Sequence, residues 1–223
     1  MSVKQLEVLP DEAAAAERFA RELAERTRRG VEERGSFTIA LSGGSGPWQA
    51  FRLLADEDVP WDAVEIFQVD ERVAPAGDDD RNLTHMQESL PAAALARLRP
   101  MPVEADDLDA AAAGYAALLP ERLDLVHLGI GPDGHTASLV PDDAVLEVHD
   151  RDVALTAGEY LGRRRMTLTY PMLDRSRDLL WFVTGESKVD ALRKLLAGDP
   201  SIPAGRIAGP PALILADRAA SPG

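Results

Sequence analysis

The sequence predicts an α/β protein with a doubly wound, mostly parallel sheet flanked by helices. Two observations support this prediction. Short apolar runs alternate with longer segments of helical period along the chain, which is typical of repeated β–loop–α units. Loops rich in glycine or charge follow several of the apolar runs, where the carboxyl ends of parallel strands meet and ligands bind. Right-handed crossovers would then place helices on the sheet.

Each element follows from its own pattern. Residues 4–9 are expected to form a strand, and residues 11–35 a long helix with Asp11 near its start and Gly35 at its end. Further apolar runs predict strands at residues 37–42, 63–71, 98–103, 123–130, 153–157, 165–170, 179–185 and 212–217. Helical spacing predicts helices at residues 48–55, 82–90, 107–119 and 187–197.

Residues 1–223 are expected to form a single domain. The chain has no internal repeat, no low-complexity linker and no clear break in composition. The polar stretch "APAGDDDRN" at residues 74–82 is interpreted as a loop, because strand and helix patterns resume on both sides of it.

Composition and charge exclude several classes of partner. A formal net charge of −14 argues against nucleic acid, because neutralising phosphates requires a basic face; we interpret the acidity as a solvated surface. No apolar run reaches the roughly 18 residues of a membrane span, and the first residues lack a secretory signal. The absence of cysteine is compatible with a reducing compartment, so we expect a cytoplasmic protein without membrane partners.

Three loops at the expected carboxyl edge have compositions suited to chemistry. The first is "LSGGSGP" at residues 41–47, in which Gly43 and Gly44 let the backbone approach an anion, and Ser42 and Ser45 add hydroxyl donors. The loop matches neither a Walker A motif nor a GxGxxG fingerprint. By itself it is either a phosphate cradle or a tight turn between strand and helix.

The second loop is "VDERVAP" at residues 69–75. Asp70, Glu71 and Arg72 directly follow an apolar strand, so their charges converge on the expected cleft. Arg72 has the planar, forked guanidinium that suits a phosphate. The alternative is a solvated loop or an internal ion pair.

The third loop, "GIGPDGHTASLVP" at residues 129–141, carries a candidate general base. Asp133 and His135 flank Gly134, and a histidine titrates near neutrality and often activates water. His127 lies inside an apolar run and is interpreted as a core residue, whereas the other two histidines are expected at the surface.

The three loops together resemble the motifs of 6-phosphogluconolactonases. "LSGGSGP", "DERVAP" with Asn82 downstream, and "GIGPDGHTASLVP" occur in the order and approximate spacing of that family. "RRRMTLTYPML", "VTGESK" and "ILADRAA" extend the resemblance over residues 41–220. Within this context the "DGHTASL" motif is highly specific.

The resemblance implies a fold, a reaction and a partner. The fold is the α/β fold shared with glucosamine-6-phosphate deaminases and ribose-5-phosphate isomerases. The reaction is hydrolysis of 6-phospho-D-glucono-1,5-lactone to 6-phosphogluconate in the oxidative pentose phosphate pathway, with no metal and no organic cofactor. The partner is then a small sugar phosphate lactone, and the chain is expected to be a monomer or a weak homo-oligomer.

The resemblance also assigns roles in catalysis. His135 would take a proton from water as it attacks C1 of the lactone, while Asp133 would shape the turn, orient the ring or contact sugar hydroxyls. Because such a lactone is an activated ester, a positioned base worth roughly 10²–10⁴-fold is sufficient without a serine nucleophile.

A second set of residues would hold the substrate. These are Gly43, Gly44, Ser45, Asp70, Arg72, Asn82, Arg165 and Lys188. The glycine loop and Arg72 would grip the 6-phosphate, and Lys188 would be a further phosphate ligand. Arg165 would line the anionic pocket, and Asn82 would organise its neighbours rather than react.

Three positions depart from the family pattern. Gly46 stands where a threonine is usual, so one hydroxyl donor is missing beside the phosphate cradle. Arg81 replaces the usual serine before Asn82, and would be either an extra phosphate donor or a surface substitution. Val140 replaces the usual phenylalanine, which is interpreted as a packing change.

Two other functions remain as alternatives. An amino-sugar phosphate deaminase or isomerase would need a carboxylate soon after "DGH", but this chain has none before Asp142. A non-catalytic sugar-phosphate sensor would be expected to have lost His135 or Arg72, and both are present.

Overall fold

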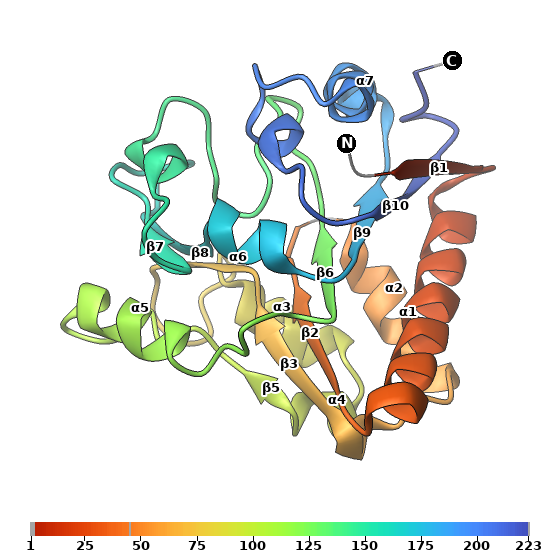
Figure 1. The fold of residues 1–223 in the computed structure, drawn as a ribbon, viewed down its shortest axis with the longest axis horizontal. Coiled ribbons are helices and arrows are strands. Elements are labelled where there is room, and N and C mark those ends of the chain that lie inside the picture. The colour runs from red at the N-terminus through yellow and green to blue at the C-terminus, as the bar shows by residue number, and fades with distance from the viewer. Residues whose placement is uncertain (1–2, 45, 223) are drawn as a thin grey trace.

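The computed structural model describes residues 3–44 and 46–222, and in this part of the chain seven strands form one parallel sheet. The strand order is β1-β10-β9-β6-β2-β3-β5, and Figure 1 shows the strands crossing the centre of the molecule. The strands of this sheet are β1 (Lys4–Leu9), β2 (Phe37–Leu41), β3 (Val64–Gln68), β5 (Leu98–Arg99), β6 (Leu125–Leu128), β9 (Leu179–Val183) and β10 (Ala212–Asp217). The predicted doubly wound parallel sheet is therefore confirmed.

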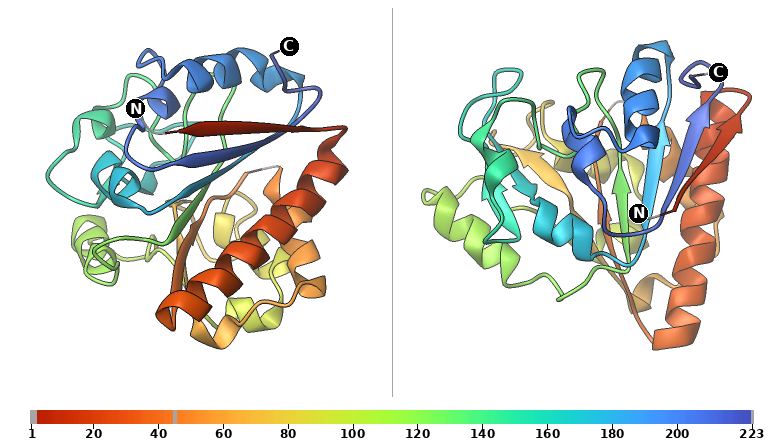
Figure 2. Two further views of the ribbon diagram at one scale, coloured as in Figure 1. Left: turned by 45° about the vertical axis from the view of Figure 1, so that its right-hand side comes forward. Right: turned by 45° about the horizontal axis from the view of Figure 1, so that its top comes forward.

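Helices cover both faces of this sheet, as Figures 1 and 2 show. The helices are α1 (Glu12–Arg34), α2 (Pro47–Leu53), α3 (Asn82–Ser89), α4 (Ala92–Leu95), α5 (Leu108–Ala116), α6 (Tyr170–Arg175) and α7 (Val189–Ala197). Apolar side chains of α1 to α4 pack on one face, and those of α5 to α7 pack on the other. Successive residues of a strand point to opposite faces, which is why these buried strands are apolar nearly throughout.

The long first helix begins and ends where the sequence predicts. The Asp11 carboxylate accepts a hydrogen bond from the Ala14 backbone N–H at 2.9 Å, and this caps the free amide groups of the first turn. Gly35 ends the helix at a φ of 79°, a left-handed conformation that glycine adopts without steric cost.

A second, three-stranded antiparallel sheet was not predicted. It has the order β4-β8-β7, with β4 (Asp70–Arg72), β7 (Val153–Leu155) and β8 (Arg165–Leu168). The expected strand at residues 63–71 is in fact two strands, because the chain leaves the main sheet after β3 and pairs with β8. Register in this pair places Arg72 directly opposite Arg165.

Proline explains two further differences from the expected elements. The strand expected at residues 98–103 ends at Arg99, since Pro100 and Pro102 have no N–H to donate to a neighbouring strand. The strand expected at residues 165–170 ends at Leu168, and α6 begins at once with Pro171 in its first turn, where proline is favoured. Among the described residues, no helix is both long and apolar enough to cross a membrane.

His127 is a core residue, as its position in an apolar run predicts. Its side chain is 1% exposed and its ring packs edge-on against the rings of Phe19 and Phe51, with centroids 4.8 and 5.6 Å away. Its Nδ1 accepts a hydrogen bond from the Ser42 backbone N–H at 3.3 Å. Burial lowers the pKa of His127 from 6.5 to about 3, so the folded protein holds the ring neutral.

We expect His127 to make the folded state less stable in mild acid. Below pH 6.5 the unfolded chain binds a proton on this ring that the folded chain does not bind, so stability falls as the pH drops towards 3. Between pH 7 and pH 5 the loss from this residue is about 2 kcal/mol. Urea unfolding of His127→Leu and the wild type at both pH values measures it: the variant's stability should depend less on pH by that amount.

The matched control is His149→Gln, because the His149 side chain is 65% exposed. This variant should keep the wild-type pH dependence. An identical acid slope in His127→Leu and the wild type would contradict the assignment.

Candidate active site

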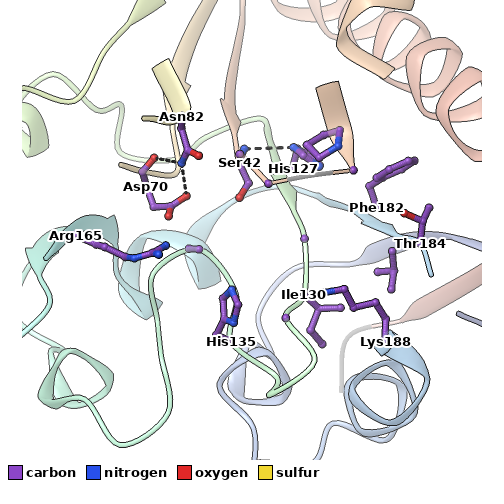
Figure 3. A pocket seen from close by; sticks show the side chains of 18 of the residues that line it. Ser42, Asp70, Asn82, His127, Ile130, His135, Arg165, Phe182, Thr184 and Lys188 are labelled. Atoms are coloured by element: carbon purple, nitrogen blue, oxygen red, sulfur yellow. Dashed lines mark hydrogen bonds between the residues drawn. The ribbon is translucent and has the colours of Figure 1, made fainter. Parts of the chain in front are cut away.

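The three predicted loops meet at the carboxyl edge of the main sheet around one cavity of about 250 Å³ (Figure 3). A fourth segment, which follows β9, closes the cavity from the side of Lys188. The predicted site residues that line the cavity are Gly43, Gly44, Asp70, Arg72, Asn82, His135, Arg165 and Lys188. Asp133 contacts His135 without lining the cavity, and Ser45 lies outside the described residues.

His135 is held by Asp133 through the ring nitrogen Nδ1. The Nδ1···Oδ1 distance is 2.6 Å, and the same carboxylate oxygen accepts the His135 backbone N–H at 3.2 Å. Burial by itself would raise the pKa of the Asp133 carboxyl, but the hydrogen bonds and charge of His135, together with a hydroxyl from Tyr160, hold it below its ordinary value. Asp133 thus contacts both the backbone of the turn and the ring of His135, which is the geometry that shaping the turn and orienting the ring would require.

Gly131 is required for this arrangement. A Cβ at this position would lie 2.0 Å from Nδ1 of His135 and 2.6 Å from Oδ1 of Asp133. The missing side chain therefore makes the space in which the histidine and the carboxylate meet.

Tyr160 is a site residue that the sequence did not reveal. Its hydroxyl lies 2.9 Å from Oδ2 of Asp133 and 3.1 Å from Nδ1 of His135. It belongs to a polar turn between β7 and β8, and no spacing or motif in the sequence connects that turn with the residues around His135.

A buried hydrogen-bond network forms the wall of the cavity around Asp70. This carboxylate is 3% exposed and accepts hydrogen bonds from the Ser138 hydroxyl at 2.6 Å and from the Asn82 amide at 3.3 Å. The other amide atom of Asn82, Oδ1, accepts from Arg72 at 2.8 Å. Asn82 thus bridges Arg72 and Asp70 by hydrogen bonds.

Arg81 has neither of the roles expected for it. It is 2% exposed and its guanidinium lies 3.3 Å from the Glu71 carboxylate, which is itself completely buried. Glu71 also accepts hydrogen bonds from the backbone N–H groups of Asn82 and Leu83 at 2.7 and 2.8 Å. Arg81 is therefore the buried counter-ion of a carboxylate that ties β4 to the start of α3, and not a phosphate donor or a surface substitution.

Two arginines lie side by side on neighbouring strands in the cavity wall. Arg72 and Arg165 are register partners in the β4–β8 pair, and both line the cavity. Arg165 donates to the Tyr160 carbonyl at 3.2 and 3.3 Å. Burial lowers the pKa of Arg165; the Asp70 carboxylate opposes this shift and the charge of Arg72 adds to it. Like charges placed directly opposite on two strands repel, so this pair favours an anion in the cavity.

Lys188 brings a further cation to the cavity. It lies in the turn before α7, and its ammonium forms no ion pair or hydrogen bond with any other residue that the structure describes. Burial lowers the pKa of this ammonium and the Asp133 carboxylate partly opposes the effect. Figure 3 shows the side chain directed towards the cavity.

In the glycine loop, Gly43 lies against Asn82 and has no space for a side chain. A Cβ on Gly43 would lie 1.9 Å from Oδ1 of Asn82, and Gly44 has a φ of 126°, which side chains disfavour. Gly46, where the family pattern has a threonine, sits beside Phe182, whose ring would be 3.1 Å from an added Cβ. Val140, the third departure, is a buried core residue, as expected.

In the described part of the chain, no group of three or more histidine or carboxylate side chains is arranged to hold a metal ion. The cavity is lined by His135, one buried carboxylate and three cations, and His135 contacts a carboxylate and a tyrosine beside the cavity.

Residues 10–214 match the model of the family described as glucosamine-6-phosphate isomerases/6-phosphogluconolactonase. The chain belongs to this family. The match includes every site residue named above, from the glycine loop to Lys188.

Known members of the family agree with this assignment. A 6-phosphogluconolactonase of Synechocystis sp. is 34% identical over 209 residues, covering 86% of this chain and 85% of that protein. The crystal structure of a 6-phosphogluconolactonase from Shewanella baltica superposes with a TM-score of 0.87 at 26% identity, covering 97% of this chain and 98% of that one.

The fold similarity extends to the other branch of the family. A monomeric glucosamine-6-phosphate deaminase superposes with a TM-score of 0.80 at 20% identity, covering 97% of this chain and 98% of that one. This likeness concerns the fold, and it confirms the predicted relation to the deaminase fold.

Gly43→Ala tests the contact between the glycine loop and Asn82. The new methyl group overlaps the Asn82 amide, so the loop or Asn82 must move, and we expect a loss of roughly 1–3 kcal/mol of unfolding free energy. Chemical denaturation measures the loss. The control is Gly114→Ala in α5, where an added Cβ meets nothing within 4 Å and stability should stay the same or rise by up to about 1 kcal/mol. Equal stabilities of the two variants would contradict the close approach.

Proposed function

We propose that this protein hydrolyses 6-phospho-D-glucono-1,5-lactone to 6-phosphogluconate. The observation that carries the proposal is the orientation of His135: Nδ1 is engaged by Asp133, and the ring lines a cavity that also contains three cations. A base and an anion site in one cavity are what a phosphorylated ester requires. Membership of the family and the names of the Synechocystis and Shewanella relatives support the same substrate.

In the proposed reaction His135 acts first as a base and then as an acid. With Nδ1–H donated to Asp133, Nε2 carries the free lone pair and takes a proton from water as the water oxygen attacks C1. The tetrahedral intermediate collapses by breaking the bond from C1 to the ring oxygen. That oxygen receives the proton from Nε2, which leaves the open-chain acid and neutral His135. Asp133 stabilises the intervening imidazolium by its charge.

The 6-phosphate is proposed to bind where the cations converge. Arg72 and Arg165 stand in opposed register, and the backbone of Gly43 and Gly44 borders the same space. A phosphate between the two guanidinium groups would offset their repulsion and accept charge-assisted hydrogen bonds. Lys188 would add charge from the other wall.

Asp70 fits the sugar better than the phosphate. A buried carboxylate repels a phosphate, but it accepts hydrogen bonds from hydroxyl groups. The Ser138 and Asn82 donors hold its two oxygens in place at the cavity wall. We therefore assign Asp70 to the sugar hydroxyls.

The proposal extends to the organisation and location of the protein. We propose that residues 1–223 act as a single domain, which is supported by the contact of the small antiparallel sheet with the apolar core on one face of the main sheet. We propose a cytoplasmic location because the chain contains no cysteine, which fits a reducing compartment. A monomer or weak homo-oligomer is part of the same proposal.

The direct test is hydrolysis of lactone generated in situ from glucose 6-phosphate. Purified protein should remove the lactone faster than it opens spontaneously. His135→Ala should lower kcat by roughly 10²–10⁴-fold, because the base is lost, while 6-phosphogluconate still binds in calorimetry. Wild-type protein that leaves the spontaneous rate unchanged would refute the function, and normal turnover by His135→Ala would remove this residue from the base role.

Arg72→Ala should mainly weaken substrate binding. Loss of a guanidinium that contacts phosphate raises KM, with a smaller effect on kcat, since the phosphate is remote from C1. The control is Arg151→Ala, an arginine 60% exposed whose partner is the neighbouring Asp150. An unchanged KM in Arg72→Ala, as in the control, would argue against the phosphate assignment.

A further inference from the structure

The Tyr160 hydroxyl contacts both members of the histidine–carboxylate pair. It lies 2.9 Å from Oδ2 of Asp133 and 3.1 Å from Nδ1 of His135, and its ring meets the imidazole at a centroid distance of 5.1 Å and an angle of 61°. Three polar groups from two distant segments therefore share one small cluster beside the cavity.

Only one distribution of protons satisfies this cluster. Asp133 has a lowered pKa and is ionised, so it can only accept. Burial and the neighbouring Asp133 charge raise the pKa of Tyr160 to about 12, so its hydroxyl keeps its proton at neutral pH and donates it to Oδ2. Two acceptors then face Nδ1 of His135: Oδ1 of Asp133 at 2.6 Å and the lone pairs of the tyrosine oxygen. Nδ1 must therefore carry the hydrogen.

Tyr160 is itself firmly positioned. Its carbonyl accepts two hydrogen bonds from Arg165, whose guanidinium carbon lies 5.0 Å from the centre of the tyrosine ring. Three residues after Tyr160, Arg163 pairs with Asp78 and Asp80 at 3.0 and 2.8 Å. Arg163 and Arg165 thus anchor the turn that carries Tyr160, and its hydroxyl has a defined position.

We infer that Tyr160 is a positioning residue that holds His135 in the tautomer with hydrogen on Nδ1 and leaves Nε2 free as the base. Oδ1 of Asp133 also accepts the His135 backbone N–H at 3.2 Å, but without a partner on Oδ2 the carboxylate could still rotate and hold the ring through that oxygen. With Oδ2 occupied by Tyr160, the carboxylate has one orientation, and Oδ1 is fixed on Nδ1. This inference rests on the proposed function and assigns to Tyr160 the orientation of its base.

Tyr160→Phe removes the hydroxyl and keeps the ring. We expect kcat to fall roughly 10-fold or more, since a hydrogen bond to an ionised group is lost, with KM within about twofold of the wild type. Tyr160→Leu, which removes the ring as well, should lower kcat further. Thermal unfolding confirms that each variant is folded.

Nitrogen NMR of the His135 side chain tests the inference independently of activity. In the wild type the ring should show a protonated Nδ1 and a bare Nε2, and both Tyr160 variants should show a mixture of tautomers. The control is Glu159→Gln, an exposed neighbour in the same turn, which should keep the wild-type kcat and spectrum.

The outcomes separate the two proposals. Wild-type protein without lactonase activity but with a single tautomer that the Tyr160 variants lose would refute the function and retain the positioning role. Tyr160 variants with the wild-type tautomer and kcat would overturn the positioning role and leave the lactonase proposal intact.

Discussion

The arrangement of the cavity depends on the antiparallel pairing of β4 with β8. This pair places Arg72 opposite Arg165 and Asp70 opposite Thr167. Thr167 in turn accepts a hydrogen bond from the Ser138 backbone N–H at 3.1 Å, so the pair also fixes the loop that carries His135. A shift of one residue in this register would turn every side chain of β4 to the other face and separate the cations from the base.

The buried ion pair of Glu71 and Arg81, on the side of β4 away from the cavity, stabilises this pairing. Glu71 points away from the cavity and accepts hydrogen bonds from the Gln68 amide, the Arg72 backbone N–H and the start of α3, with Arg81 as its counter-ion. A buried carboxylate is tolerated only when its acceptor positions are filled and its charge is opposed. In the "DER" motif, Asp70 and Arg72 therefore face the cavity, whereas Glu71 ties β4 to the start of α3.

Several charged groups in the cavity lack a partner of opposite charge within the described part of the fold. Two arginines in opposed register and a lysine without a carboxylate partner among the described residues are costly for stability. Such local conflicts are characteristic of functional sites, where the ligand supplies the missing partner. In the proposed function, the missing partner is a phosphate joined to a hydroxylated ring.

Features that depend on near neighbours in the chain were predictable from the sequence. Alternating apolar segments predicted the parallel sheet, and Asp133, two residues from His135, predicted a local pair around a tight turn. The second sheet, the opposition of Arg72 to Arg165, the burial of Arg81 and the contact of Tyr160 with His135 are visible only in the folded structure. These features involve residues that are far apart along the chain. The rules for turns and periodicity act over a few residues. The register between strands some 90 residues apart and the choice of partner for a buried charge are both set by packing of the whole fold.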